Sequence, residues 1–279
     1  HESGQFYSLS YAKMPFLLAP NIWSVFYKPG KENLKERSHG DKVLFGQQSI
    51  EELEEYFWKV YLNDVYIREQ FLFQHEIDET VFNKYSFYRS MVSRGEESNH
   101  YLAKNNNLLL RYASLRKSLT EFKVIFLFRD PVQHALSLQN QHNRYIEMQN
   151  DDSFVLEYMN WLGHHEFGLN HKPISIGANT FLSTPESINY WLAVWVAYYN
   201  AFLQIVDLGN HVLLVEYDDF ANKPQEVFDA VSSFIDISLN LKHSVPFHLA
   251  KRDAEGLDEH ILAKSNEIYR KLLERKIKV

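Results

Sequence analysis

A short stretch in the middle of the chain carries residue types suited to binding an anion. Residues 124–128 are all apolar, which is typical of a strand buried on both faces of a parallel sheet. Arg129 ends this run, Asp130 is a preferred N-cap residue, and Pro131 suits the first position of a helix. We therefore predict a strand followed directly by a helix. The positive end of the helix dipole would lie beside a guanidinium that can bind phosphate oxygens. Ser137 falls on the second turn of that helix.

A polar loop near the start of the chain, Arg37-Ser38-His39-Gly40-Asp41, contains a pair suited to proton transfer. His39 and Asp41 are two residues apart, and Gly40 lets the backbone bend so that both side chains could converge. A carboxylate beside an imidazole holds its tautomer and raises its basicity, as a general base near neutral pH requires. The alternative is a solvated surface loop in which His39 has no role, and the residues alone leave both interpretations open.

The sequence His164-His165-Glu166 contains three residue types that can bind a metal ion. Adjacent residues point about 100° apart on a helix, or to opposite faces of a strand, so three in a row do not easily bind one ion. We therefore predict no metal site here. Packing, or recognition of an acceptor by one of the two histidines, is the favoured interpretation.

Four strands are predicted to position these residues, near 6–11, 100–104, 123–128 and 211–216. Three of the four end in polar residues: Lys104-Asn105, Arg129-Asp130 and Tyr217-Asp218-Asp219. Parallel sheets gather the carboxyl ends of their strands at one edge, where ligands of open α/β proteins bind. The sequence therefore predicts one crevice formed by these strand ends.

Helical periodicity and capping residues predict the elements between the strands. Ser49 followed by Glu52 matches a capping box, and Asp152 and Gly163 flank a short helix as its N-cap and C-cap. Trp191 and Trp195 lie on an apolar stripe that is more typical of a core than of a cofactor site. The predicted helices are 50–62, a helical pattern through 69–93, 108–119, one from Pro131, 153–162, one from 183 to Gly209, 224–235 and 257–276.

Composition limits the protein classes to consider. With 279 residues, 45% of them hydrophobic, the chain can bury a full core and is most simply one α/β domain. A net charge of -7 argues against a nucleic-acid partner, and the absence of cysteine excludes disulfides and thiolate chemistry. No apolar run is long enough to cross a membrane. We accordingly expect a cytoplasmic protein, and its oligomeric state is left open.

The Arg-Asp-Pro motif, with Ser137 eight residues after Arg129 at the end of an apolar strand, resembles the 3′-phosphate motif of sulfotransferases that use 3′-phosphoadenosine 5′-phosphosulfate (PAPS). The resemblance runs through nearly the whole chain and is strongest to a bacterial sulfotransferase-like branch, which shares Met-Pro-Phe, Lys-Asn-Asn-Asn and His-His-Glu-Phe-Gly stretches. It implies a P-loop-NTPase-like sulfotransferase fold, a parallel sheet flanked by helices. It also implies a structural rather than a catalytic role for Asp218.

One expected part of such a protein is not found in the sequence. The resemblance implies a 5′-phosphosulfate loop of the type Arg-Ser-Gly-Thr-Thr after the first strand, and no such loop occurs in the 279 residues. In related sequences that loop comes just before the segment matched by residues 1–11. We therefore expect residues 1–279 to be a single sulfotransferase-like domain that is N-terminally incomplete, and that could be inactive without the loop.

The implied reaction moves a sulfuryl group from PAPS to a hydroxyl or amine of a small-molecule or glycan acceptor, leaving the desulfated nucleotide (PAP). By resemblance, Arg129 and Ser137 would bind the 3′-phosphate, Lys104 would face the sulfuryl group or the acceptor, and no metal is required. His39 with Asp41 is the candidate base. Two alternatives stay open: a P-loop kinase of similar topology, and a non-catalytic relative that binds only a nucleotide or a partner.

Overall fold

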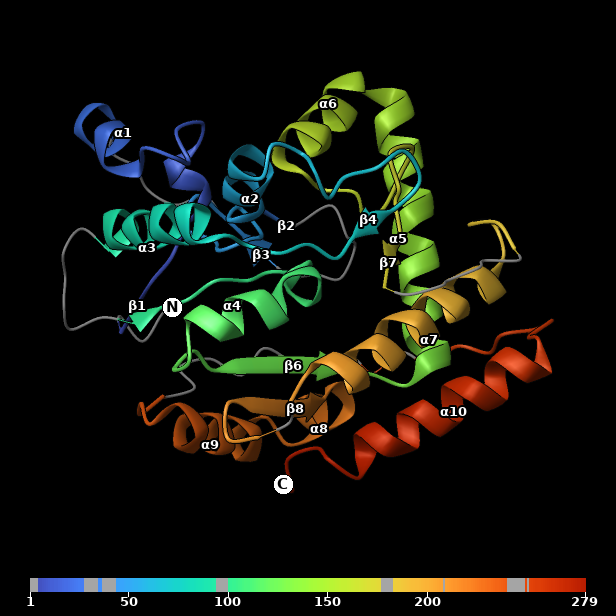
Figure 1. Ribbon diagram of the computed structural model, residues 1–279. Coiled ribbons are helices and arrows are strands. Elements are labelled where there is room, and N and C mark those ends of the chain that lie inside the picture. The colour runs from blue at the N-terminus through green and yellow to red at the C-terminus, as the bar shows by residue number, and fades with distance from the viewer. Residues whose placement is uncertain are drawn as a thin grey trace. The chain divides into compact units, whose positions relative to one another are not determined.

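The computed structural model describes residues 5–27, 35–36, 44–93, 100–176, 183–207, 209–239, 249 and 251–279. Short strands and 3-10 helices alternate with longer helices along the chain (Figure 1). In chain order the elements are β1 (Phe6–Tyr7), η1 (Tyr11–Lys13), α1 (Pro20–Phe26), β2 (Lys35–Glu36), β3 (Leu44–Phe45), α2 (Glu55–Tyr61), β4 (Leu72–Phe73), α3 (Glu79–Ser93), β5 (His100–Tyr101), η2 (Leu108–Leu110), α4 (Tyr112–Ser118), β6 (Val124–Phe128), α5 (Pro131–Asp151), α6 (Ser153–Leu162), β7 (Ile174–Ser175), α7 (Ile188–Ile205), β8 (Val212–Glu216), α8 (Tyr217–Asn222), α9 (Pro224–Ile235) and α10 (Glu259–Leu273).

The chain forms two compact units. The first comprises residues 1–115 and 144–173, and the second comprises residues 116–143 and 174–279. Helix α5 therefore begins in the second unit and ends in the first. None of the helices in the described ranges is long and apolar enough to cross a membrane.

The second unit is built around a parallel pair of strands. β6 pairs with β8 in a register that sets Val124 opposite Val212 and Phe128 opposite Glu216. Helices α7 and α10 lie side by side in this unit (Figure 1). Phe202 of α7 packs edge-on against Phe126 with ring centroids 4.5 Å apart, so α7 covers the face of β6 that carries Phe126.

One prediction about β6 is wrong. The apolar run was expected to be buried on both faces, but its burial alternates, with Phe126 8% exposed, Ile125 40% exposed and Leu127 56% exposed. Successive side chains of a strand point to opposite faces, and only the face of Val124, Phe126 and Phe128 is covered by the described residues.

The first unit holds a second parallel pair. β1 pairs with β5, with Phe6 opposite His100 and Tyr7 opposite Tyr101, so both strands are shorter than the predicted 6–11 and 100–104. The two parallel pairs and their flanking helices agree with the predicted α/β class. Whether residues 1–279 are one incomplete domain stays a prediction.

Helix α2 of this unit begins later than predicted. A helix was expected from residue 50 with Ser49 and Glu52 as a capping box, but α2 begins at Glu55. The Ser49 hydroxyl instead accepts from the Gly46 amide at 2.9 Å, and the Glu52 carboxylate accepts from backbone amides of a distant loop. The tertiary contacts of Glu52 therefore replace the local cap.

Several boundaries follow the capping residues. Asp130 accepts from the amide of Gln133 at 2.9 Å at the start of α5, and Asp152 accepts from the amide of Phe154 at 2.9 Å at the start of α6. Gly163 ends α6 with φ 82°, a left-handed conformation that favours glycine. The helical pattern predicted through 69–93 is wrong before residue 79, because Asp78 caps α3 by accepting from the amide of Val81 at 2.7 Å.

Candidate functional site

The carboxyl end of β6 forms the predicted strand-to-helix junction. The strand ends at Phe128 and α5 begins at Pro131, with Asp130 as its cap. The guanidinium of Arg129 lies 4.8 Å from the centre of the Tyr217 ring, at the start of α8. Stacking on an aromatic ring orients a guanidinium plane, and the dipole of a 21-residue helix favours an anion at its N-terminus. Ser137 is exposed on the second turn of α5.

The neighbouring strand β8 ends in carboxylates that are engaged within the unit. Glu216 is buried and accepts hydrogen bonds from the Tyr269 hydroxyl and the Lys276 ammonium, and Lys276 also pairs with Asp219. Burial and the nearby charge of Glu216 raise the pKa of Asp218. These contacts fasten the end of the chain to β8, in line with a structural role for this segment.

In the first unit, an acidic segment, Glu51-Glu52-Leu53-Glu54-Glu55, holds the loop that follows β5. Lys104 is exposed and its ammonium forms an ion pair with Glu51. The amides of Asn106 and Asn107 donate to Oε1 of Glu52 at 2.6 and 3.2 Å. The loop carrying Lys104 is therefore fixed by hydrogen bonds rather than by regular secondary structure.

The other two carboxylates of the acidic segment are buried among aromatic residues. Glu54 accepts from four donors, which are Trp58 Nε1 at 3.1 Å, Asn105 Nδ2 at 3.2 Å, and the hydroxyls of Tyr85 and Tyr101. Glu55 forms an ion pair with Arg111 and accepts from the Tyr66 hydroxyl. Glu51, Glu52 and Glu54 thus all contact the loop after β5. Glu54 also contacts α3, and Glu55 contacts Arg111, the residue before α4.

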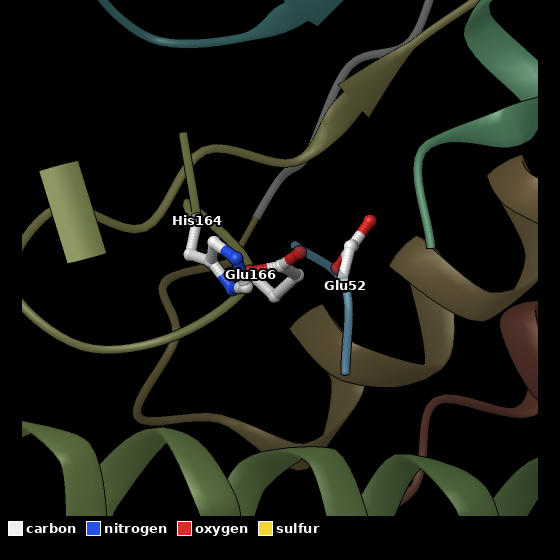
Figure 2. A group of neighbouring side chains, drawn as sticks. All are labelled: Glu52, His164 and Glu166. Atoms are coloured by element: carbon white, nitrogen blue, oxygen red, sulfur yellow. Dashed lines mark ion pairs between the residues drawn. The ribbon is translucent and has the colours of Figure 1, made fainter. Parts of the chain in front are cut away.

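Glu52 also belongs to a group of three potential metal ligands, shown in Figure 2 with His164 and Glu166 of the loop that follows α6. One ligand atom from each residue lies within 4.8 Å of the others. Burial and the charges of Glu166 and Glu55 raise the pKa of Glu52 well above its usual range. A bound proton or a bound cation would therefore stabilise these closely spaced carboxyl groups.

Hydrogen bonds with Gln149 and Asn170 hold the loop that carries His164 and Glu166. Gln149 of α5 accepts from the amide of Leu169 at 2.6 Å, and Asn170 donates to the carbonyl of His164 at 2.9 Å. The ring of His165 turns away from the group, since its Nδ1 lies 3.0 Å from the carbonyl oxygen of Asn170. His165 is thus not a member of the group formed by Glu52, His164 and Glu166.

The structure places the predicted site residues in different parts of the chain. Arg129 and Ser137 lie in the second unit, on the junction and helix predicted for them, and Lys104 lies in the first unit after β5. His39 and Asp41 lie outside the described residues. The roles of all five residues stay predictions.

Sequence reasoning missed Glu52 and the other carboxylates of the acidic segment. Glu52 was interpreted as half of a capping box, which is a surface role, yet Glu52, Glu54 and Glu55 are 1%, 4% and 0% exposed. The available signal was the density of four glutamates around Leu53, directly before an aromatic-rich helix. Buried carboxylates need donors. Glu54 and Glu55 receive them from Trp, Tyr and Asn side chains of this unit: Trp58, Tyr66, Tyr85, Tyr101 and Asn105.

Comparison with known proteins gives a domain match. The family model for the sulfotransferase domain matches residues 49–264. The crystal structure of a sulfotransferase from Alicyclobacillus acidocaldarius is similar over 81% of this chain and 84% of that chain, with 14% sequence identity and a TM-score of 0.39. No curated protein matches the chain. The assignment of the chain to a family rests only on the match to the family model.

Proposed function

The chain belongs to the sulfotransferase domain family, and we propose that it transfers a sulfuryl group from PAPS to a hydroxyl or amine of an acceptor. Family membership makes it a transferase of sulfuryl groups with an α/β sulfotransferase fold. The nucleotide donor and the class of acceptor are the parts that we propose.

The observation that carries the proposal is the junction between β6 and α5. Arg129 stands at the end of a parallel strand, beside the N-terminus of a long helix and over the ring of Tyr217. A guanidinium in that position can bind two phosphate oxygens at once, and an exposed hydroxyl on the next turn, that of Ser137, can donate to a third. These groups suit the 3′-phosphate that PAPS and PAP carry and that adenosine 5′-phosphosulfate and ATP lack.

The proposed reaction is an in-line displacement at sulfur. The acceptor oxygen or nitrogen forms a bond to sulfur while the bond from sulfur to the bridging oxygen breaks, and PAP leaves with that electron pair. Positioning, and a cation near the leaving oxygen, supply most of the rate enhancement in such transfers. We assign the cation to Lys104, and the removal of the acceptor proton to His39 supported by Asp41.

Nucleotide binding tests the proposal. Arg129→Ala in the full-length protein should weaken PAP binding by about tenfold or more, because a charge-assisted phosphate contact contributes about 1.5–3 kcal/mol. Ser137→Ala should weaken it less. Arg116→Ala is the matched control, because its guanidinium donates to the carbonyl of Phe122, before the opposite end of β6, at 2.8 Å.

The competing functions give different results in the same experiment. Equal affinity for PAP and for adenosine 5′-phosphosulfate, which lacks the 3′-phosphate, would remove the basis of the assignment. Turnover with ATP and Mg²⁺ would indicate a kinase, and PAP binding without sulfuryl transfer to any acceptor would indicate a binding protein. Screening small alcohols, amines and glycans as acceptors, and fractionating cells that produce the protein, test the acceptor class and the cytoplasmic location.

A further inference from the structure

We propose that Glu52, His164 and Glu166 bind a divalent transition-metal ion such as Zn²⁺. This site lies outside the groups assigned to PAPS, and the proposal does not depend on the proposed function. It departs from the prediction that the chain has no metal site, because that prediction considered His164, His165 and Glu166 and not a ligand from elsewhere in the chain.

The first argument is the set of donor atoms. An imidazole nitrogen and two carboxylate oxygens are ligands that Zn²⁺ takes in sites with three protein ligands and an open position. Ligands about 2.0–2.2 Å from an ion in a tetrahedral site stand about 3.3–3.6 Å apart. The three ligand atoms already lie within 4.8 Å of one another, so they need to approach one another by at most about 1.5 Å, which side-chain rotation can supply.

The second argument is the state of the polar atoms that face the group. Glu52 is 1% exposed, and its Oε1 accepts from two backbone amides. No donor among the described residues reaches its Oε2, and the Glu166 carboxyl lies close to the Glu52 carboxyl. Nε2 of His164 and Oε1 of Glu166 are also buried, and neither forms a hydrogen bond with any residue that the structure describes. Buried polar atoms normally have partners, and three in one group point to a shared one.

The third argument is preorganisation. Glu52 is held by the Asn106 and Asn107 amides, and the loop of His164 and Glu166 is held by Gln149 and Asn170. His164 and Glu166 are close to each other, with Nδ1 and Oε2 4.0 Å apart, and their side chains are 21% and 19% exposed. Partial exposure leaves a route by which an ion can enter. A bound ion would join the loop of Lys104 to the loop after α6 through Glu52.

The test is metal binding by the full-length protein after its affinity tag is removed and its metals are stripped. Competition with a chromophoric chelator should give one Zn²⁺ per chain, and Zn²⁺ should raise the Tm of the protein by several degrees. Co²⁺ should give visible absorption bands whose intensity reports the coordination number of the ion.

Variants of the ligands test which residues bind the ion. His164→Gln and Glu166→Gln should each weaken Zn²⁺ binding by about 100-fold or more, because each removes a direct ligand. His171→Gln, in the same loop, is the matched control and should bind as tightly as the parent protein.

Glu52→Gln separates a metal site from a pair of carboxyl groups that share a proton. The glutamine keeps an oxygen for the two amides and turns an N–H group toward Glu166, so the variant should fold. It should raise the Tm of the metal-free protein, and Zn²⁺ should no longer raise it further. Unchanged Tm of the parent protein with Zn²⁺, or Zn²⁺ binding that none of the three variants weakens, would overturn the proposal. PAP is absent from every measurement, so failure here is independent of the proposed transfer reaction.

Discussion

The guanidinium of Arg111 donates two hydrogen bonds to the carboxylate of Glu55, at 2.7 and 2.8 Å, and neither side chain is exposed to solvent. Burial alone would raise the pKa of the Glu55 carboxyl, but the charge and hydrogen bonds of Arg111 lower it. The rings of Trp58 and Tyr66 lie 5.1 and 5.3 Å from the guanidinium. The pair therefore joins the end of η2, directly before α4, to α2 through side chains that have no contact with water.

Removing one partner of this pair should cost much more than removing both. Arg111→Met should lower the free energy of unfolding by about 3–5 kcal/mol, because it leaves a buried carboxylate without its cation. The double variant Arg111→Met with Glu55→Leu should lose less than Arg111→Met alone, because no buried charge is left without a partner. Urea unfolding measures the free energy of unfolding of the two single variants and of the double variant. Lys271→Met is the exposed control: its pair with Glu267 at 2.6 Å should contribute less than about 1 kcal/mol. Additive losses at Arg111 and Glu55 would show that the two side chains do not act as a pair.

Acid should destabilise the second unit through His134. Burial and the charge of Arg129 lower the pKa of His134 to about 4, and its Nδ1 is enclosed without a partner in the described structure. The folded protein thus keeps this ring neutral while the unfolded chain protonates near its ordinary pKa of about 6.5. The contribution to stability is complete above about pH 6.5 and is lost as the pH falls toward 4.

The measurement is the slope of unfolding free energy against pH between 6.5 and 4. His134→Phe keeps a ring but removes the titration, so the slope should decrease by up to about 1.4 kcal/mol per pH unit, the value for one proton. Identical slopes in the parent protein and the variant would contradict the assignment of a neutral His134 ring in the folded protein.

Gly168 should be the least replaceable of the described glycines. It has φ +83°, and a Cβ there would lie 2.3 Å from Oε1 of Gln149. Gly168→Ala combines backbone strain with displacement of Gln149, so we expect a loss of about 1–3 kcal/mol in unfolding free energy. Gly256→Ala is the matched control, because Gly256 has φ +67° and nothing within 4 Å of the added atom. The difference between the two variants in thermal or urea unfolding isolates the contact with Gln149, and equal losses would argue against it.

His39→Ala should separate catalysis from nucleotide binding. If His39 removes the acceptor proton, its loss should lower turnover by about 100-fold or more while PAP affinity stays nearly unchanged. Asp41→Asn should have a smaller effect of the same kind. Full activity of His39→Ala would end the proposal and direct attention to His164 and His165.

Lys104→Ala should also lower turnover, since it removes the cation assigned to the leaving oxygen. The control is Lys264→Ala, which removes an exposed lysine from α10. Equal turnover in the two lysine variants would mean that Lys104 serves only its ion pair with Glu51.

Elements whose ends depend on local chemistry could be predicted from the sequence. α9 has the predicted bounds, and β6 differs from the predicted 123–128 by one residue. α6 has both its predicted caps, because Asp152 and Gly163 act on their own neighbours, as Pro224 does at the start of α9. The sulfotransferase family was likewise predicted from a local motif around Arg129.

Features decided by distant contacts could not be predicted in the same way. Glu52 satisfies every local rule for a cap, but amides more than fifty residues away bind it instead. His164 and Glu166 gain a third neighbour only through the fold of the first unit. The exposed face of β6, with Ile125 and Leu127, shows the same limit: an apolar run indicates a strand but not which of its faces is covered.

The acidic segment has a consequence for how the first unit opens. Glu52, Glu54 and Glu55 bind the loop after β5, α3 and the residue before α4 from one short stretch of chain. Opening of that stretch would therefore break all of these hydrogen bonds at once. Amide hydrogens report such cooperative opening by exchanging with solvent at a common rate. The amides of Asn106 and Asn107 lie in a loop, where exchange is usually fast. Because their acceptor is a buried carboxylate, they should exchange as slowly as the amides of α2 and at the same opening free energy.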